Sequence, residues 1–160
     1  MRVVFILILA ILLTTLGAAV AGPAEDFRDA KAARSRDDYA TALRLYLRAA
    51  EQGHVDAQME LGYIYFKGQM RLQYDDTESA KWYLRAAELG NAMAQRNIGM
   101  AYRFGQGVPK DQVTGLMWLN LAVARGFKDA VHSRDAIARE MTPAQVAEAQ
   151  KLTDEWKPKR

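Results

Sequence analysis

Few residues of this chain are of the types that carry out chemistry. Two acidic pairs, Asp37-Asp38 and Asp75-Asp76, have the composition that general acid–base catalysis uses. His132 has an aspartate three residues away on each side, and an acidic neighbour at that spacing can orient an imidazole on a helix. The second histidine, His54, directly follows a glycine. No nucleophile motif accompanies either histidine, so a turn or surface role is the simpler interpretation of both.

The composition removes several classes of site. The chain has 160 residues, 22 basic and 19 acidic side chains, a net charge of +3 and no cysteine. Without cysteine it can hold no disulfide, thiolate zinc site or iron–sulfur cluster, and its length suits one domain. The sequence Gly105-Gln-Gly107 lacks the Lys-Ser/Thr of a phosphate-binding loop. The scattered basic residues argue against nucleic acid as a partner, and we expect no cofactor and no metal.

Two blocks of sequence recur along the chain at a nearly constant distance. The first block ends in glycine and occurs at residues 45–53, 82–90 and 118–126, so that its glycines are 37 and 36 residues apart. The second block covers residues 57–68 and recurs at residues 94–105, with an offset of 37. A period of this length, kept in phase by two separate blocks, is typical of a solenoid of helix pairs.

The second block predicts the first helix of each pair. Ala57, Leu61 and Tyr65 recur every three or four positions and therefore share one helix face. Gly62 and Gly99 lower helix propensity, which is tolerable where a neighbouring helix approaches closely. We expect the large apolar residues of both blocks to be packing residues rather than a site: Leu61, Tyr65, Trp82, Ile98, Tyr102 and Trp118.

The second helix of each pair is expected to begin after an aspartate and to end at a glycine. Aspartate caps the first turn of a helix, and glycine readily takes the left-handed conformation that ends one. The aspartates are Asp38, Asp75 and Asp111, and the glycines are Gly53, Gly90 and Gly126. Glu78 is placed to complete a capping box with Asp75. The acidic pairs are therefore interpreted as caps rather than as catalytic groups.

The unit at residues 91–126 resembles the Sel1-like repeat family, a relative of the tetratricopeptide repeat. It carries nearly the whole family pattern: Ala94, Ile98-Gly99, Tyr102, Gly105-Gln-Gly107-Val108, Asp111, Trp118, Ala122 and Gly126. The unit at residues 54–90 matches at the equivalent positions and departs in its loop. The resemblance implies an all-α, right-handed solenoid of antiparallel helix pairs, with about eight helices, acting mainly as an interaction scaffold.

The two ends of the chain are expected to differ from the repeats. Residues 1–21 have the charge, apolar run and small residues of a signal peptide cleaved after Ala21, with an uncleaved anchor as the alternative. The rest, residues 22–160, is expected to form a single helical-repeat domain. Its parts are a degenerate repeat at 22–53, repeats at 54–90 and 91–126, and capping helices at 127–160. Thr142, Pro143 and Gln145 predict the start of the last helix, Trp156 should pack on the last repeat, and 157–160 should be a solvated tail.

One face of the first helices is the candidate binding surface for a protein or peptide. In repeats of this kind these helices line the concave side, where extended binding surfaces arise. In the first full unit that face carries Met59, Tyr63 and Phe66, and in the next unit it carries Arg96, Met100 and Arg103. An apolar patch beside arginines suits an amphipathic helix or an extended peptide with an acidic group. The alternative is that the ends of the chain cover the first three residues as core.

These observations favour a non-enzymatic, exported adaptor that binds a protein or peptide on the concave helical face. The periplasm is the expected location, with no membrane contact once the signal is cleaved; an extracellular or membrane-anchored protein is the alternative. Two other functions stay open: a cell-wall or small-ligand-binding protein or hydrolase of the envelope, and a secreted host-facing factor. A cysteine-rich branch of the family is associated with β-lactam binding, and the absence of cysteine breaks that link.

Overall fold

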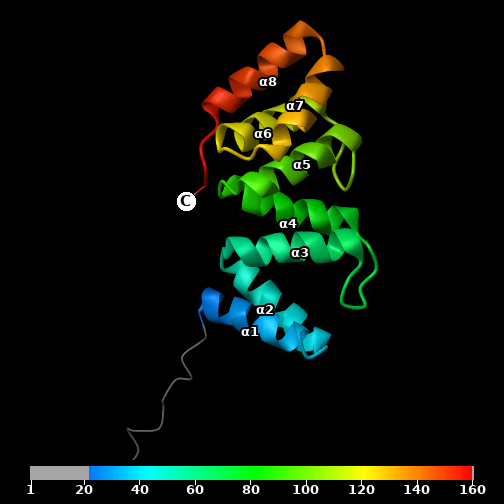
Figure 1. Ribbon diagram of the computed structural model, residues 1–160, viewed down its shortest axis with the longest axis vertical. Helices are drawn as coiled ribbons and strands as arrows, with labels where there is room; N and C mark the ends of the chain where they lie inside the picture. Colours follow the sequence, from blue (N-terminus) through cyan, green and yellow to red (C-terminus); the bar gives the residue numbers. More distant parts are fainter. Residues whose placement is uncertain (1–21, 160) are drawn as a thin grey trace, which may run out of the picture.

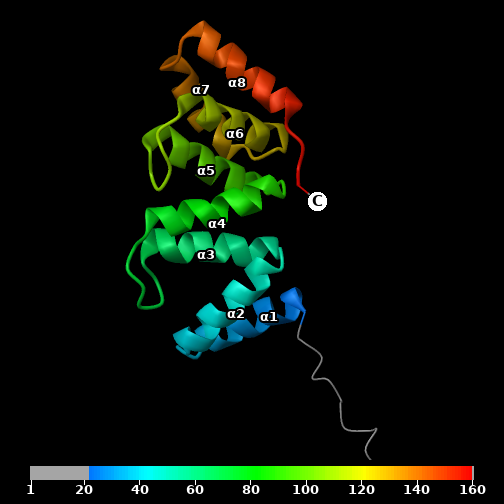
Figure 2. The same ribbon diagram turned by 180° about the vertical axis from the view of Figure 1, so that it is seen from behind.

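The computed structural model describes residues 22–159, so the expected signal peptide at 1–21 lies outside the described part of the chain. Consecutive helices stack as antiparallel pairs along the long axis of the molecule, which confirms the predicted all-α solenoid (Figures 1 and 2). Between residues 22 and 159 no helix has the length and apolar character needed to cross a bilayer. The helices are α1 (Pro23–Arg34), α2 (Tyr39–Glu51), α3 (Val55–Lys67), α4 (Asp76–Glu88), α5 (Ala92–Phe104), α6 (Gln112–Ala124), α7 (Asp129–Arg139) and α8 (Pro143–Glu155).

Polar side chains cap the helix starts as the sequence predicts. Asp38, Asp75 and Asp111 each accept backbone N–H hydrogen bonds from the first turn of α2, α4 and α6. His54 Nδ1 accepts from the Ala57 N–H at 3.3 Å, which makes this histidine a cap of α3. The acidic pairs and His54 are therefore held in structural roles.

One predicted capping box is wrong and the other is confirmed. Glu78 does not reach back to the start of α4, because its carboxylate accepts from Lys81 Nζ at 2.9 Å instead. At the start of α8 both halves of the box are present: the Gln145 N–H donates to Thr142 Oγ1, and the Thr142 N–H donates to Gln145 Oε1 at 2.9 Å. The box at the start of α4 does not form because Lys81 competes for the Glu78 carboxylate.

Glycine is required where helices or loops approach each other closely. A Cβ on Gly62 would lie 2.7 Å from the Tyr83 ring, so its absence lets α4 press against α3. Gly107, in the loop before α6, has φ +70°, and a Cβ there would lie 2.0 Å from the Asp76 carbonyl oxygen. Met70 stands at the same repeat position with φ +56°, an unfavourable conformation for a residue with a side chain. The loop after α3 is therefore a strained version of the loop after α5.

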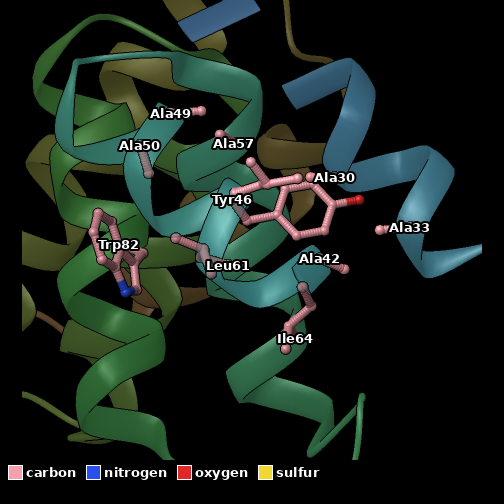
Figure 3. Packing of buried hydrophobic residues seen from close by; sticks show 11 residues of the cluster. Ala30, Ala33, Ala42, Tyr46, Ala49, Ala50, Ala57, Leu61, Ile64 and Trp82 are labelled. Atoms are coloured by element: carbon pink, nitrogen blue, oxygen red, sulfur yellow. The ribbon is translucent and has the colours of Figure 1, made fainter. Parts of the chain in front are cut away.

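The core is a row of clusters formed between successive helices. Figure 3 shows one of them, with the Tyr46 ring between α1 and α3 and with Leu61 and Ile64 beside it. Hydrogen bonds add to this packing across the repeat boundary: Gln58 Nε2 donates to the Ala50 carbonyl oxygen at 3.0 Å, and Gln95 makes the equivalent bond one repeat later. Of the predicted packing residues, four are buried and two half-buried: Leu61, Trp82, Ile98 and Trp118, then Tyr65 and Tyr102.

The C-terminal segment packs differently from the predicted solvated tail. Trp156 lies against Trp118 as expected, with ring centroids 5.8 Å apart in an edge-on arrangement. The chain then runs back past α6 toward the end of α4 (Figures 1 and 2). There the Lys159 N–H donates to the Glu88 carbonyl oxygen at 2.8 Å, and Lys159 Nζ pairs with the Glu88 carboxylate at 2.7 Å. Residues 157–159 are thus a strap rather than a free tail.

An ion pair that the sequence analysis did not anticipate joins the first two helices. Asp26 is completely buried in α1 and accepts two hydrogen bonds from the Arg48 guanidinium of α2. These bonds hold the pKa of the Asp26 carboxyl below its usual range. A buried carboxylate needs such a partner because burial alone penalises its charged form.

We predict that Gly107→Ala destabilises the protein far more than Gly53→Ala. Both glycines have positive φ, but a Cβ at Gly53 meets nothing within 4 Å, so only conformational strain of about 1–2 kcal/mol is expected there. At Gly107 the backbone must also move away from α4, which raises the loss to about 3 kcal/mol or more. Urea unfolding followed by circular dichroism measures both values. Equal losses would show that the loop does not pack on α4.

We predict that the stabilisation from Asp26 is lost in acid. A carboxyl whose folded-state pKa is depressed stabilises the fold above its ordinary pKa of about 4 and loses that contribution as the pH falls through the folded-state value. Asp26→Asn should therefore lower the free energy of unfolding at pH 7, and its difference from the native chain should shrink below about pH 4. The exposed Asp29→Asn on the same helix is the control. A difference that is constant from pH 7 to pH 2 would contradict the role of this pair.

Candidate functional site

Four of the six predicted site residues lie around one hollow on the surface. It has a volume of about 380 Å³ and lies between α3 and α5, with α4 forming its floor. Tyr63 and Phe66 come from α3, and Arg96 and Met100 come from α5. We call it the apolar hollow and define it by these four residues together with Tyr83 and Phe104.

The other two predicted residues are engaged elsewhere. Met59 is half-buried and packs against a core cluster formed by α4, α5 and α6, rather than under the ends of the chain as the core alternative proposed. Arg103 donates a hydrogen bond to the carboxylate of Glu140, just after α7, and its guanidinium lies 5.0 Å from the centre of the Phe104 ring. Tyr63 and Phe66 are not covered as core, since each is 42% exposed.

The floor of the apolar hollow is fixed by the close packing of α3 and α4. Ser79 Oγ donates to the Gly62 carbonyl oxygen at 2.8 Å, and the Tyr83 ring lies against Gly62. Burial raises the pKa of Tyr83 to about 12, so its hydroxyl stays neutral at every physiological pH. Tyr83 therefore contributes an uncharged side chain to the floor, while Asp76 at the start of α4 adds a carboxylate to the lining.

Two aromatic side chains of the hollow were missed at the sequence level. Phe104 is 56% exposed and lies four residues after Met100 on the same face of α5, so helical spacing alone could have identified it. Tyr83 lies on the second helix of its pair, which was treated as packing only. Its signal is weaker, because nothing in the repeat pattern indicates that a buried residue of a second helix forms the bottom of a hollow between two first helices.

Arg96 and Asp76 line the apolar hollow, and two further cations lie near its phenylalanine rings. Lys67 Nζ lies 4.9 Å from the centre of the Phe66 ring, and the Arg103 guanidinium lies over the Phe104 ring. Arg96 donates to Asn97 Oδ1 at 3.3 Å and forms no ion pair with a carboxylate of residues 22–159. An incoming acidic group would find a cation there without breaking an ion pair of Arg96.

A second hollow lies on the other side of α3. Its volume is about 320 Å³, and we call it the charged hollow, defined by Lys31, Arg34, Ser35, Tyr46 and Glu60. Arg34 donates to Glu60 Oε2 at 2.9 Å and to Gln69 Oε1 at 2.8 Å. Glu60 is one helical turn before Tyr63, so α3 alone separates this hollow from the apolar hollow.

Neither histidine of the chain lines either hollow. His132 is exposed on α7, away from both hollows, and Asp135 beside it accepts hydrogen bonds from Arg134. No cluster of three or more histidine, aspartate or glutamate side chains in the described range is arranged to hold a metal ion. The two hollows offer shape, apolar surface and charged groups of both signs, which are properties of a binding surface.

Two solved structures are similar to this chain. A protective antigen present in uropathogenic Escherichia coli strains, described as displaying an SLR fold, matches with a TM-score of 0.76 at 23% identity. The match covers 85% of this chain and 30% of that protein, so this chain spans less than a third of the antigen's length. A Sel1 repeat protein from Oxalobacter formigenes matches with a TM-score of 0.66 at 32% identity, covering 71% of this chain and 88% of the other. No curated protein matches.

The family comparison agrees with the repeat pattern in the sequence and with the helix pairs. The model of the Sel1 repeat matches three times, at residues 31–54, 55–91 and 92–127, which together make up more than half of the chain. Proteins built from this repeat generally mediate protein–protein interactions, and the repeat is typically a non-enzymatic scaffold. On these matches the chain belongs to the Sel1 repeat family.

Proposed function

We propose that this protein is a non-enzymatic adaptor that holds a segment of a partner protein against α3 and α5, with an apolar side chain of the partner in the apolar hollow. The observation that supports this most directly is the group of exposed aromatic side chains around the hollow. Tyr63, Phe66 and Phe104 are each 42–56% exposed, although folding normally removes such large apolar groups from water. A partner that covers them would gain the free energy of that burial.

The affinity for such a partner is expected to be modest. The hollow of about 380 Å³ accommodates only one or two side chains, whereas stable protein–protein interfaces involve some 20–30 residues on each side. A few anchoring side chains nevertheless carry most of the energy of many interfaces. Met100 can adapt its unbranched side chain to different anchors, which suits binding of related rather than identical segments.

A small-molecule ligand is the alternative occupant of the apolar hollow. Its volume lies at the lower end of the range of small-molecule sites, and the buried Ser79 offers a hydroxyl group in its wall. The lining is mainly apolar and aromatic, with Tyr63, Phe66, Tyr83, Met100 and Phe104 among its residues, which favours an apolar side chain of a protein segment. A cell-wall fragment would need several polar groups to fix its orientation.

We propose that the chain is exported and acts in the periplasm after cleavage at Ala21. The apolar run of residues 3–16 and the small residues that follow it support this location. The expected result is that the protein isolated from cells begins at Gly22, as measured by N-terminal sequencing and intact mass. Recovery of the whole 17.9 kDa chain from the membrane fraction would instead support the anchored form.

We predict that a photo-reactive amino acid at Tyr63 crosslinks to a discrete partner in living cells. A control probe at Arg44, an exposed position of α2, should give no discrete adduct. Phe104→Ala should weaken the Tyr63 adduct severalfold, because it removes one wall of the apolar hollow and leaves the core unchanged. The matched control is Tyr74→Ala, which removes an aromatic side chain that is 65% exposed outside the hollow. Equal labelling from Tyr63 and Arg44 would refute binding at this surface.

A further inference from the structure

The charged hollow contains a buried hydroxyl group that the fold itself does not use. Tyr46 is completely buried, and its Oη makes no hydrogen bond of good geometry within the described residues, although the Arg34 guanidinium lies close enough to act on the pKa of this phenol. Figure 3 shows the hydroxyl oxygen turned toward α1, between Ala30 and Ala33. A buried hydroxyl without a partner costs free energy, and a phenylalanine would fill the same space without that cost. The hydroxyl is therefore placed as a donor for an acceptor that comes from outside the fold.

The charges around this hydroxyl select the kind of acceptor. Lys31 and Arg34 contribute two positive charges, and Glu60 contributes the only negative charge of the charged hollow. Arg34 is paired with Glu60 at 2.9 Å, whereas Lys31 forms no ion pair with a carboxylate of residues 22–159. An excess of one positive charge beside an unused hydroxyl donor fits a carboxylate, which accepts hydrogen bonds and carries one negative charge.

We propose that the partner segment binds in an extended conformation across α3, with a carboxylate in the charged hollow and an apolar side chain in the apolar hollow. This proposal rests on the proposed function and specifies the chemistry of its partner. The carboxylate would accept from Tyr46 Oη and pair with Lys31. It would come either from an acidic side chain or from the end of the partner's chain.

The geometry of the helices sets the spacing of the two groups in the partner. The hollows lie on opposite sides of α3, one toward α1 and the other toward α5. Adjacent packed helices are roughly 8–10 Å apart, and an extended chain advances about 3.3 Å per residue. The carboxylate and the apolar side chain should therefore be about three residues apart. A partner bound as a helix would need a larger separation in sequence to span the same distance.

The test is a selection of peptides from a random library displayed on phage, with the purified full chain as the target. Wild-type protein should enrich peptides that carry an aspartate or glutamate about three residues from an aromatic or large aliphatic residue. Tyr46→Phe and Lys31→Gln should each still enrich the apolar residue but enrich the acidic one less strongly, and the double variant should lose the acidic preference. Tyr39→Phe, which removes a tyrosine hydroxyl outside both hollows, should select the same peptides as wild type.

Binding measurements on the selected peptides complete the test. Fluorescence anisotropy should show that replacing the acidic residue with its amide weakens binding to wild type about tenfold and weakens binding to Tyr46→Phe by a smaller factor, because Lys31 remains in that variant. Peptides that end at this position with a free carboxylate, compared with their C-terminal amides, distinguish a chain terminus from a side chain. Tyr46→Phe should unfold at the same temperature as wild type or higher, because the lost hydroxyl has no partner within the fold.

Each outcome separates this inference from the proposed function. Enrichment of apolar residues with no acidic preference would overturn the inference and leave the proposed adaptor role standing. No enrichment over a protein-free control would count against both. A clear fall in the unfolding temperature of Tyr46→Phe would also overturn the inference, since it would show that the hydroxyl serves the fold.

Discussion

The close contact between the two helices of each pair is the constraint on which the rest of the structure depends. Gly62 in α3 and Gly99 in α5 have no side chain where α4 and α6 press against them. This contact brings the Tyr83 ring against Gly62 of α3, and so sets the depth of the floor of the apolar hollow between α3 and α5. A bulkier residue would separate the helices and open the hollow. The same feature that stabilises the repeat therefore shapes its surface.

The architecture could be predicted almost completely because it depends on local and periodic signals. Caps, left-handed glycines and the 36–37-residue period each act over one turn or one repeat, and all of them agree on where the helices begin and end. Apart from the capping box at Glu78, which Lys81 prevents locally, the features that were missed lie where distant parts of the chain meet. The bond between Lys159 and Glu88 and the ion pair between Asp26 and Arg48 join residues that no periodic pattern relates.

The candidate site was only partly predictable for a related reason. Helical spacing identified Tyr63, Phe66, Arg96 and Met100 as residues of one face, and the structure places them around one hollow. The same spacing could not tell that Met59 turns into the core or that Arg103 is held by Glu140. Such outcomes depend on how far neighbouring units are rotated against each other, and this rotation is a property of packing rather than of any short stretch of sequence.

The C-terminal strap changes how the molecule should open. In a linear repeat protein each repeat contacts only its neighbours, so the repeats at both ends unfold first. Here α8 packs on α6, and the strap continues from it to the end of α4. Loss of the last helices therefore requires breaking contacts with an interior unit, which raises the free energy of local unfolding at that end. Opening is concentrated at the other end, in α1 and α2, so that the wall of the charged hollow belongs to the most easily remodelled part of the protein.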